Sequence, residues 1–196
     1  EKLRPTDVDE FKANVRLDKF LPPLLEALPQ KCAVVTNCDF LNEAYDESGF
    51  DLIIGNPPWE SRGDKQIGLH FAERTREYLR PDGVCCLILP TTILVNLHGT
   101  LDNNWFQSVK VERIVQLADF RRLLFKATHA CFVLRYSNTR PSIDFVVQYE
   151  TPKVSRFDRR RGIIVVEPDD HKSITLREII EAGLQDRLQS IWSQNF

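Results

Sequence analysis

The sequence contains no methionine, not even at its first position, and only four histidines in 196 residues. We expect a chain without an initiating methionine to be an excised piece of a longer protein. No apolar run is long enough to span a membrane, and no secretory signal opens the chain. The sequence therefore predicts a cytoplasmic protein without a membrane partner. The histidines are scattered, so their spacing predicts no metal site.

Paired cysteines are also missing. The five cysteines are odd in number, none stands in a Cys-x-x-Cys spacing, and all lie in apolar segments typical of strands. This pattern argues against zinc ligation and disulfides, and it predicts buried, reduced thiols. The cysteines are Cys32, Cys38, Cys85, Cys86 and Cys131.

The chain has enough apolar residues for one core. Hydrophobic residues make up 42% of it and the formal net charge is −2, which suits one compact domain rather than two large ones. Short apolar runs alternate with amphipathic segments, and this alternation predicts an α/β fold with a parallel sheet and right-handed crossovers. Strands are expected at residues 32–36, 52–54, 84–89, 114–117 and 128–136, and helices at residues 7–28, 67–79 and about 100–109.

The pattern changes after residue 140. Two further strands are expected at residues 143–149 and 162–166, and a helix from residue 173 to about residue 188. Between the strands, residues 156–161 contain four arginines and one phenylalanine, a composition that suits contact with phosphates. A solvated surface is the default interpretation, because the whole chain is slightly acidic.

A rigid corner follows the second expected strand. Residues 52–54 form an apolar run that we expect to be buried on both faces of a sheet, and Gly55 ends it. The next four residues are Asn-Pro-Pro-Trp, which we call the proline corner (residues 56–59). Two prolines fix their own backbone angles and push Asn56 toward an extended conformation. The corner therefore presents one amide, several free carbonyl groups and one indole.

These groups have two interpretations when taken alone. One is a strand end with a partly buried tryptophan. The other is a site that holds a planar amine: the Asn56 side-chain oxygen and the Pro57 carbonyl would accept the two amine hydrogens and make the nitrogen more reactive. Trp59 would stack on the face of a base that has been taken out of its duplex.

The run Asp-Leu-Ile-Ile-Gly-Asn-Pro-Pro-Trp at residues 51–59 resembles motif IV of amino-methyltransferases that use S-adenosylmethionine. It is most similar to the DNA adenine-N6 methyltransferases of restriction-modification systems, of the type IIG, Eco57I-like kind. The resemblance covers about residues 30–137. It implies a Rossmann-like methyltransferase sheet, mostly parallel with an antiparallel C-terminal strand. It also implies that S-adenosylmethionine is the cofactor, that double-stranded DNA is a partner, and that the catalytic residues are Asn56, Pro57, Pro58 and Trp59.

Two weaker similarities add candidate residues. Asp39 and Phe40 follow the first expected strand, and the resemblance implies that they bind the cofactor's adenine; without it, Asp39 is a strand-end residue that caps a turn. Phe125 precedes the expected strand at residues 128–136, where the family has a phenylalanine that touches the target base; core packing is equally compatible. Arg121 and Arg122 would face DNA phosphates from the same edge, or form solvated surface.

The family binds its cofactor first through a glycine-rich turn and an acidic residue after its first two strands. This chain has no Gly-x-Gly, and its first expected strand corresponds to the family's third. We therefore expect an N-terminally truncated fold in which residues 1–140 are a partial catalytic domain. Residues 141–196 would be a C-terminal extension or the start of a DNA-recognition region. Such a fragment would have an incomplete cofactor site, be inactive alone, and need the rest of the parent polypeptide.

The predicted function is methyl transfer to adenine N6 in DNA by the parent restriction-modification enzyme. Two alternatives stay open. One is methylation of another amine, in cytosine, RNA or protein glutamine. The other is a catalytically inactive nucleic-acid-binding or assembly module on a methyltransferase scaffold. A truncated sheet would also expose an unpaired edge, through which the chain could dimerise or aggregate.

Overall fold

The computed structural model describes residues 40–42, 49–59, 61–62, 65–95, 103–124 and 129–182. The chain divides into two compact units, Glu1–Ala44 and Tyr45–Phe196. Of the first unit only a turn at residues 40–42 is described. The helix expected at residues 7–28, the strand expected at residues 32–36 and Asp39 lie outside the described residues. The fold below is that of the second unit.

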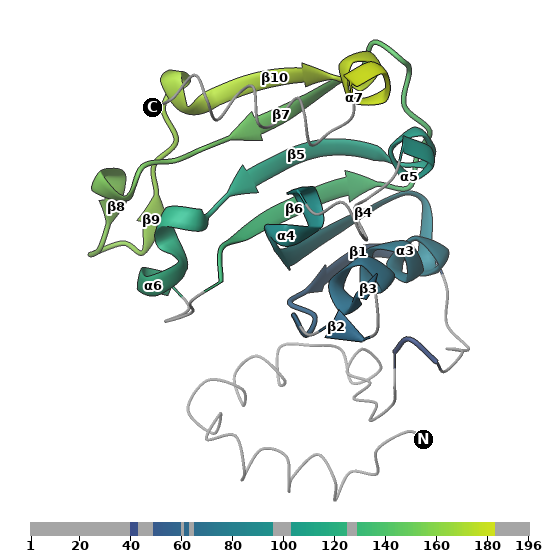
Figure 1. Ribbon diagram of the computed structural model, residues 1–196, viewed down its shortest axis with the longest axis horizontal. Helices are drawn as coiled ribbons and strands as arrows, with labels where there is room; N and C mark the ends of the chain where they lie inside the picture. The colour runs from purple at the N-terminus through teal and green to yellow at the C-terminus, as the bar shows by residue number, and fades with distance from the viewer. Residues whose placement is uncertain are drawn as a thin grey trace, which may run out of the picture. The chain divides into compact units, whose positions relative to one another are not determined.

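A six-stranded sheet with the order β1-β4-β6-β5-β7-β10 organises the second unit (Figure 1). Strands β1, β4, β5 and β7 run in one direction, whereas β6 and β10 run in the opposite one. The sheet is therefore mostly parallel, and β6 is the antiparallel strand that the resemblance implied. The strands are β1 (Phe50–Gly55), β4 (Leu79–Pro90), β5 (Lys110–Gln116), β6 (Cys131–Ser137), β7 (Val146–Glu150) and β10 (His171–Thr175).

Helices and two short ribbons complete the described part. Helix α3 (Ile67–Tyr78) connects β1 to β4, as its apolar spacing predicted. The other α-helices are α4 (Thr92–Val95), α5 (Asn103–Ser108), α6 (Arg121–Leu124) and α7 (Leu176–Ala182), and the 3-10 helices are η1 (Ala118–Phe120), η2 (Val154–Arg156) and η3 (Pro168–Asp170). The two antiparallel ribbons pair β2 (Ser61–Arg62) with β3 (Lys65–Gln66) and β8 (Phe157–Asp158) with β9 (Ile163–Ile164).

The main hydrophobic core lies between one face of the sheet and helices α3, α4, α5 and α7. Alternate residues of β4, such as Leu87 and Leu89, point into this core because successive side chains of a strand face opposite sides. They meet Leu69 of α3 and Phe106 of α5, which are almost completely buried. The predicted alternation of strands and helices thus gives one helix-covered face.

Strand β1 corrects one sequence prediction. We expected residues 52–54 to be buried on both faces, but Leu52 is 53% exposed and Ile54 is 74% exposed. Only Ile53 of this run packs against the main core. The reason is position: β1 is the outermost strand of the described sheet, and the helices of the main core cover only one of its faces.

The end of the described chain corrects a second prediction. We expected a helix from residue 173, but His171–Thr175 is strand β10 and the helix begins at Leu176. Ile174 is fully buried from the strand and not from a helix. The strand expected at residues 162–166 is also shorter, because only Ile163–Ile164 pairs with β8.

Candidate active site at the carboxyl edge of the sheet

The ends of several strands meet at one edge of the sheet. The parallel strands β1, β4 and β5 end there, and β6 begins there because it runs the opposite way. The backbone N–H of Thr91 donates to the carbonyl of Ala130 at 2.9 Å, and that of Leu117 donates to the carbonyl of Cys131 at 2.8 Å. Ligands of open α/β sheets bind at this carboxyl edge.

The proline corner leaves the sheet at this edge. Packing is tight at the end of β1, because a Cβ added to Gly55 would lie 3.1 Å from Leu87 Cδ2, which would have to shift to make room. Pro57 is buried, whereas Asn56 and Pro58 are exposed. Within the described part of the chain, the Asn56 side chain makes no hydrogen bond. Its amide is therefore held at the edge by a rigid, anchored turn and is accessible from solvent.

Trp59 is fixed from two sides. Its indole N–H donates to the carbonyl of Ile88 at 3.3 Å, and its half-buried ring packs against a small second core under the carboxyl edge. We call this core the edge cluster; its members are Trp59, Ile88, Val115, Leu117, Phe120, Cys131, Val133, Phe157 and Ile164. The structure thus shows Trp59 as a partly buried packing residue, and the stacking of a base on its ring stays a prediction.

Two of the other predicted site residues lie at the carboxyl edge, and the remaining three do not lie in the described part of the second unit. Arg121 and Arg122 begin α6, which follows β5 and η1 at the same carboxyl edge, and the Arg122 side chain is exposed. The structure therefore brings these two arginines and the proline corner to one edge. Phe125 lies outside the described residues, as does Asp39. Phe40 lies in the turn of the first unit.

A polar pair at this edge was missed by the sequence analysis. The Thr91 hydroxyl donates to Gln116 Oε1 at 3.2 Å, and both side chains are half-buried. The pair bridges the ends of β4 and β5 across the start of β6. A signal was present: Thr91 directly follows an apolar strand and Gln116 is the last residue of one, which is where polar side chains of an α/β sheet reach its carboxyl edge.

Two of the three described cysteines are buried as the sequence predicted, whereas Cys86 is half-buried. Cys85 and Cys131 are fully buried, and no described cysteine forms a disulfide. Burial raises the pKa of the Cys85 thiol, and also that of Cys86 and Cys131. These thiols are therefore protonated at neutral pH, and none of the three is an activated nucleophile.

The described residues form neither a metal-binding cluster nor a membrane-spanning helix. The described part of the chain has no group of three or more side chains placed to hold a metal ion. None of its helices has the length and apolarity needed to cross a membrane. An open depression of about 720 Å³ is lined by Glu73, Arg76 and Trp105, among others. It lies between α3 and α5 and does not include the proline corner.

The described residues fit the amine side of a methyl-transfer site better than its cofactor side. The exposed Asn56 amide and the turn that anchors it could hold an amine. Of the two residues that the resemblance assigns to the cofactor, Asp39 is not described and Phe40 belongs to the other unit. The sequence contains no glycine-rich turn to receive the rest of the cofactor.

Comparisons with known proteins agree with the fold and identify a family. The sequence model of the Eco57I restriction-modification methylase family matches residues 25–123, which include the proline corner. The fold is similar to that of the methyltransferase subunit of a type I restriction-modification system from Streptococcus thermophilus. The TM-score is 0.61 and the identity 14%, over 83% of this chain and 43% of that one.

A second solved structure, from a study of complex assembly in a type I restriction-modification system, has a TM-score of 0.51. Its identity is 14%, over 72% of this chain and 37% of that one. This chain therefore spans less than half the length of either structure, and at this identity the likeness concerns the fold alone. No curated protein matches the sequence significantly. Because the family model covers half of the sequence, the chain belongs to the Eco57I restriction-modification methylase family.

Proposed function

We propose that this chain is the substrate half of a DNA adenine-N6 methyltransferase that uses S-adenosylmethionine and belongs to a restriction-modification enzyme. One observation carries the proposal: the Asn56 amide lies exposed and without a hydrogen bond among the described residues, at the carboxyl edge of a methyltransferase-like sheet. The family match and the likeness to a methyltransferase subunit support it.

The proposed chemistry depends on the geometry of two acceptors. The exocyclic amine of adenine is a poor nucleophile because its lone pair is delocalised into the ring. The Asn56 side-chain oxygen and the Pro57 carbonyl each accept one N–H of that amine, which drives the nitrogen toward a tetrahedral, more reactive state. The cofactor supplies an electrophilic methyl group. Transfer of that methyl group from sulfur to N6 would leave the amine with one proton too many, and this proton would pass to solvent.

The neighbouring residues would position the base. A base must leave its duplex before its amine can reach the corner. Because the Ile88 carbonyl and the edge cluster hold the indole of Trp59, its ring offers a pre-oriented surface for stacking on that base. Phe125, in the segment before β6, would also hold the ring of the base. Arg121 and Arg122 would contact backbone phosphates.

Replacing Asn56 tests the role of its side-chain amide. In the complete protein, Asn56→Ala is expected to lower methyl transfer to DNA by roughly 100-fold or more, because one of two acceptors that stabilise the reacting amine is lost. DNA binding should stay largely intact. Transfer is measured with a labelled methyl donor, and the modified nucleoside is identified by mass spectrometry.

Asn104→Ala is the matched control, since Asn104 is an exposed amide on α5, away from the proline corner. Retained turnover in Asn56→Ala would refute the assigned role. Methylated cytosine, RNA or glutamine as the product would identify another amine as the substrate. DNA binding by the unaltered protein without any transfer would indicate an inactive module.

A further inference from the structure

The ribbon formed by β8 and β9 lies at the carboxyl edge of the sheet, where the proline corner also leaves it. Strand β7 is parallel to β5, so it ends at this edge, and β10 begins there because it is antiparallel to β7. The segment between Glu150 and His171 therefore leaves the sheet and returns to it at the same edge. In Figure 1, the ribbon and α6 lie at the same end of the sheet.

The edge cluster joins the ribbon to the corner. The rings of Phe157 in β8 and Phe120 in η1 meet edge to face, with centroids 6.2 Å apart. Ile164 of β9 packs against the same cluster, and so does Trp59 of the proline corner. The position of the ribbon is therefore set by the packing that also fixes the Trp59 ring.

The tip of the ribbon is held in one conformation. Asp158 Oδ1 accepts the backbone N–H groups of Arg160 at 2.9 Å and Arg161 at 3.1 Å. The N–H of Gly162 donates to the Asp158 carbonyl at 2.8 Å, and Gly162 has a φ of 65°, which a glycine adopts without strain. These bonds use backbone groups and leave the arginine side chains to solvent.

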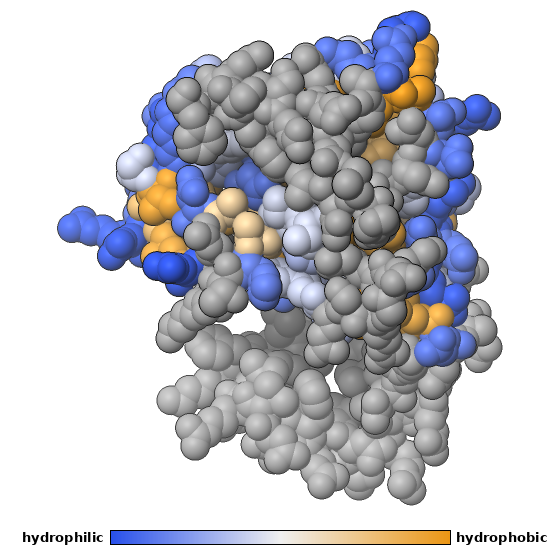
Figure 2. Space-filling view, in the orientation of Figure 1, coloured by the Kyte–Doolittle hydropathy of each residue, from blue (hydrophilic) through white to orange (hydrophobic). Residues whose placement is uncertain are grey.

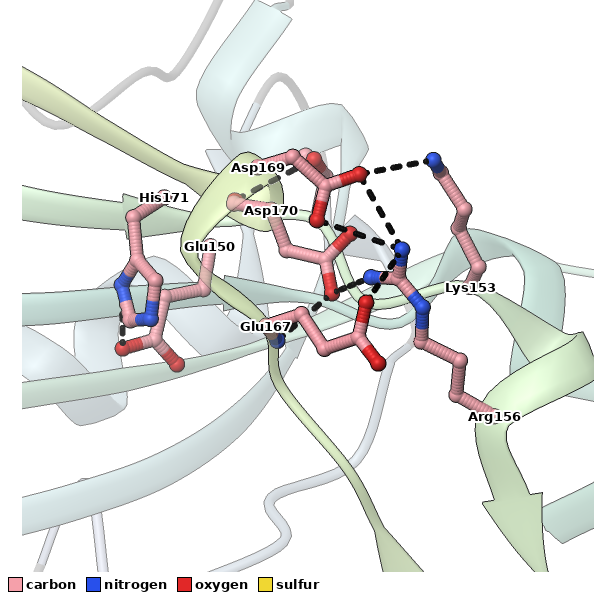
Figure 3. Close-up of polar contacts among 8 residues, drawn as sticks. Glu150, Lys153, Arg156, Glu167, Asp169, Asp170 and His171 are labelled. Carbon is pink, nitrogen blue, oxygen red and sulfur yellow. Dashed lines mark hydrogen bonds and ion pairs between the residues drawn. The ribbon is translucent and has the colours of Figure 1, made fainter.

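Arg156 has a different role from the other three arginines of its segment. Its guanidinium pairs with Glu167 at 2.8 Å, with Asp169 at 3.0 Å and with the buried carboxylate of Asp170 (Figure 3). Lys153 joins the same group through Asp169 at 3.2 Å. We call these five residues the arginine clasp. It closes the loop behind the ribbon, so Arg156 is not available for phosphate contact, which corrects that part of the sequence prediction.

The remaining three arginines form a positive group, which we call the arginine tip (Arg159, Arg160 and Arg161). All three are exposed. Arg161 lies 3.8 Å from the Asp158 carboxylate, and among the described residues no ion pair involves the guanidinium of Arg159 or Arg160. In the space-filling view, strongly hydrophilic atoms project beside an apolar patch on the side where the ribbon lies (Figure 2). Exposed Ile163 and Val165 belong to the same segment.

The charge and geometry of the tip fit one kind of partner. The three exposed arginines are consecutive, and a single carboxylate, that of Asp158, pairs with one of them, Arg161. A bound polyanion would relieve the mutual repulsion of the three positive charges. Guanidinium groups match the oxygens of a phosphate and release counterions from nucleic acid when they bind. The tip is attached, through the edge cluster, to the corner that would receive a flipped base. A duplex held at that corner presents backbone phosphates on either side of the nucleotide whose base has been flipped out.

We propose that the arginine tip binds the phosphate backbone of duplex DNA beside the nucleotide presented to the proline corner. This inference rests on the proposed function. It assigns to the ribbon a sequence-independent contact that positions the duplex, whereas Arg156 positions the ribbon itself.

The test is the salt dependence of DNA binding by the complete protein. Each phosphate contact contributes about 0.9 to the slope of log affinity against log salt concentration. The double variant Arg159→Gln/Arg160→Gln should therefore lower the slope by about 2. When the salt concentration rises from 50 to 200 mM, both proteins lose affinity for DNA. The factor by which the variant loses affinity should be about tenfold smaller than the factor for the unaltered protein. The loss of DNA affinity caused by the two substitutions should be equal on duplexes of any sequence.

Two further variants make the test specific. Arg159→Lys/Arg160→Lys keeps both charges and should keep the slope near its original value. Arg76→Gln/Arg140→Gln removes two exposed arginines from α3 and from the segment after β6, toward the opposite edge of the sheet, and should leave the slope unchanged. The inference is wrong if the tip variant keeps the full slope, or if the control lowers it equally. If the double variant does not fold, Arg160→Gln alone should lower the slope by about 1.

Methyl transfer by the unaltered protein separates this inference from the proposed function. Transfer to DNA together with an unchanged slope in the tip variant would overturn only the inference. A lowered slope without any transfer by the unaltered protein would support the tip as a DNA contact and overturn the methyltransferase proposal.

Discussion

At the scale of single residues, a buried pair of hydroxyl groups joins α3 to the sheet. Tyr136 of β6 is fully buried, and its hydroxyl bonds to that of Thr75 and donates to the Ala72 carbonyl at 3.0 Å. Burial raises the pKa of the Tyr136 phenol far above its ordinary value, so the group stays protonated and remains a donor. The ring also meets Trp105 edge to face, with centroids 5.1 Å apart.

We expect the two hydroxyls to stabilise the fold as a unit. Tyr136→Phe keeps the ring and its contact with Trp105 but removes the hydroxyl, and should lower the free energy of unfolding by about 1–2 kcal/mol. Thr75→Val should have a similar cost, because each single change leaves the partner hydroxyl buried with fewer bonds. The double variant should therefore cost less than the sum of the two. Urea unfolding at an unchanged m-value is the measurement, and strict additivity would contradict the coupling.

At the scale of elements, the arginine clasp connects the two 3-10 helices η2 and η3. Hydrogen bonds from Arg156, and then from Lys153, hold the pKa of the Asp169 carboxyl down at about 2. Its ordinary value is near 3.8, so the folded protein binds the proton of this group less readily than the unfolded chain does. The resulting stabilisation is present above about pH 4 and is lost as the pH falls toward 2.

We therefore predict a pH-dependent effect of Asp169→Asn. The variant should unfold at a lower urea concentration than the unaltered protein at pH 7. The difference between the two midpoints should shrink as the pH falls from 4 toward 2, because the unaltered carboxylate is then protonated and loses the same bonds. Urea midpoints at a series of pH values measure this difference. A difference that stays constant over the whole range would show that Asp169 stabilises the loop by something other than its charge.

The border between β10 and α7 shows which structural features local sequence signals can predict and which they cannot. The Thr175 N–H donates to Glu178 Oε2 at 2.7 Å, and the Glu178 N–H donates to Thr175 Oγ1 at 3.2 Å. This capping box is visible in the sequence as Thr-x-x-Glu and would have placed the helix start correctly. The strand before it was not predictable locally. Ile174 and Leu176 fit a helical stripe as well as an alternating strand, and pairing with β7 decides between them.

The same distinction holds for the candidate site. The proline corner, the strand before it and the strand β6 could be predicted, because apolar runs and proline act on their immediate neighbours. The antiparallel direction of β6 was implied only by the family resemblance. The pairing of Arg156 with Asp169 and Asp170 could not, since these residues meet only after a ribbon and a turn have formed. The exposure of Leu52 could not be predicted from the sequence either, because it depends on what covers a strand and not on the strand's own residues.

At the scale of the whole molecule, β1 gives the described sheet an open apolar border. Within the described residues β1 pairs only with β4. Phe50, Leu52 and Ile54 alternate along the strand, so they share one face, and they are 39%, 53% and 74% exposed. An outer strand with free backbone groups and exposed apolar side chains is a template for association with another chain.

We predict that the 196-residue chain self-associates through this strand as its concentration rises. Leu52→Lys/Ile54→Lys should suppress the association, because two like charges on an outer strand repel a second copy and oppose its desolvation. The measurement is the weight-average mass from sedimentation over a range of concentrations. Ile143→Lys is the control, since Ile143 is also an exposed apolar residue (40%) but lies in the turn before β7. Association that persists in the double variant, or that the control suppresses equally, would place the contact elsewhere. Suppression by the double variant alone would identify β1 as the border that another chain or segment covers.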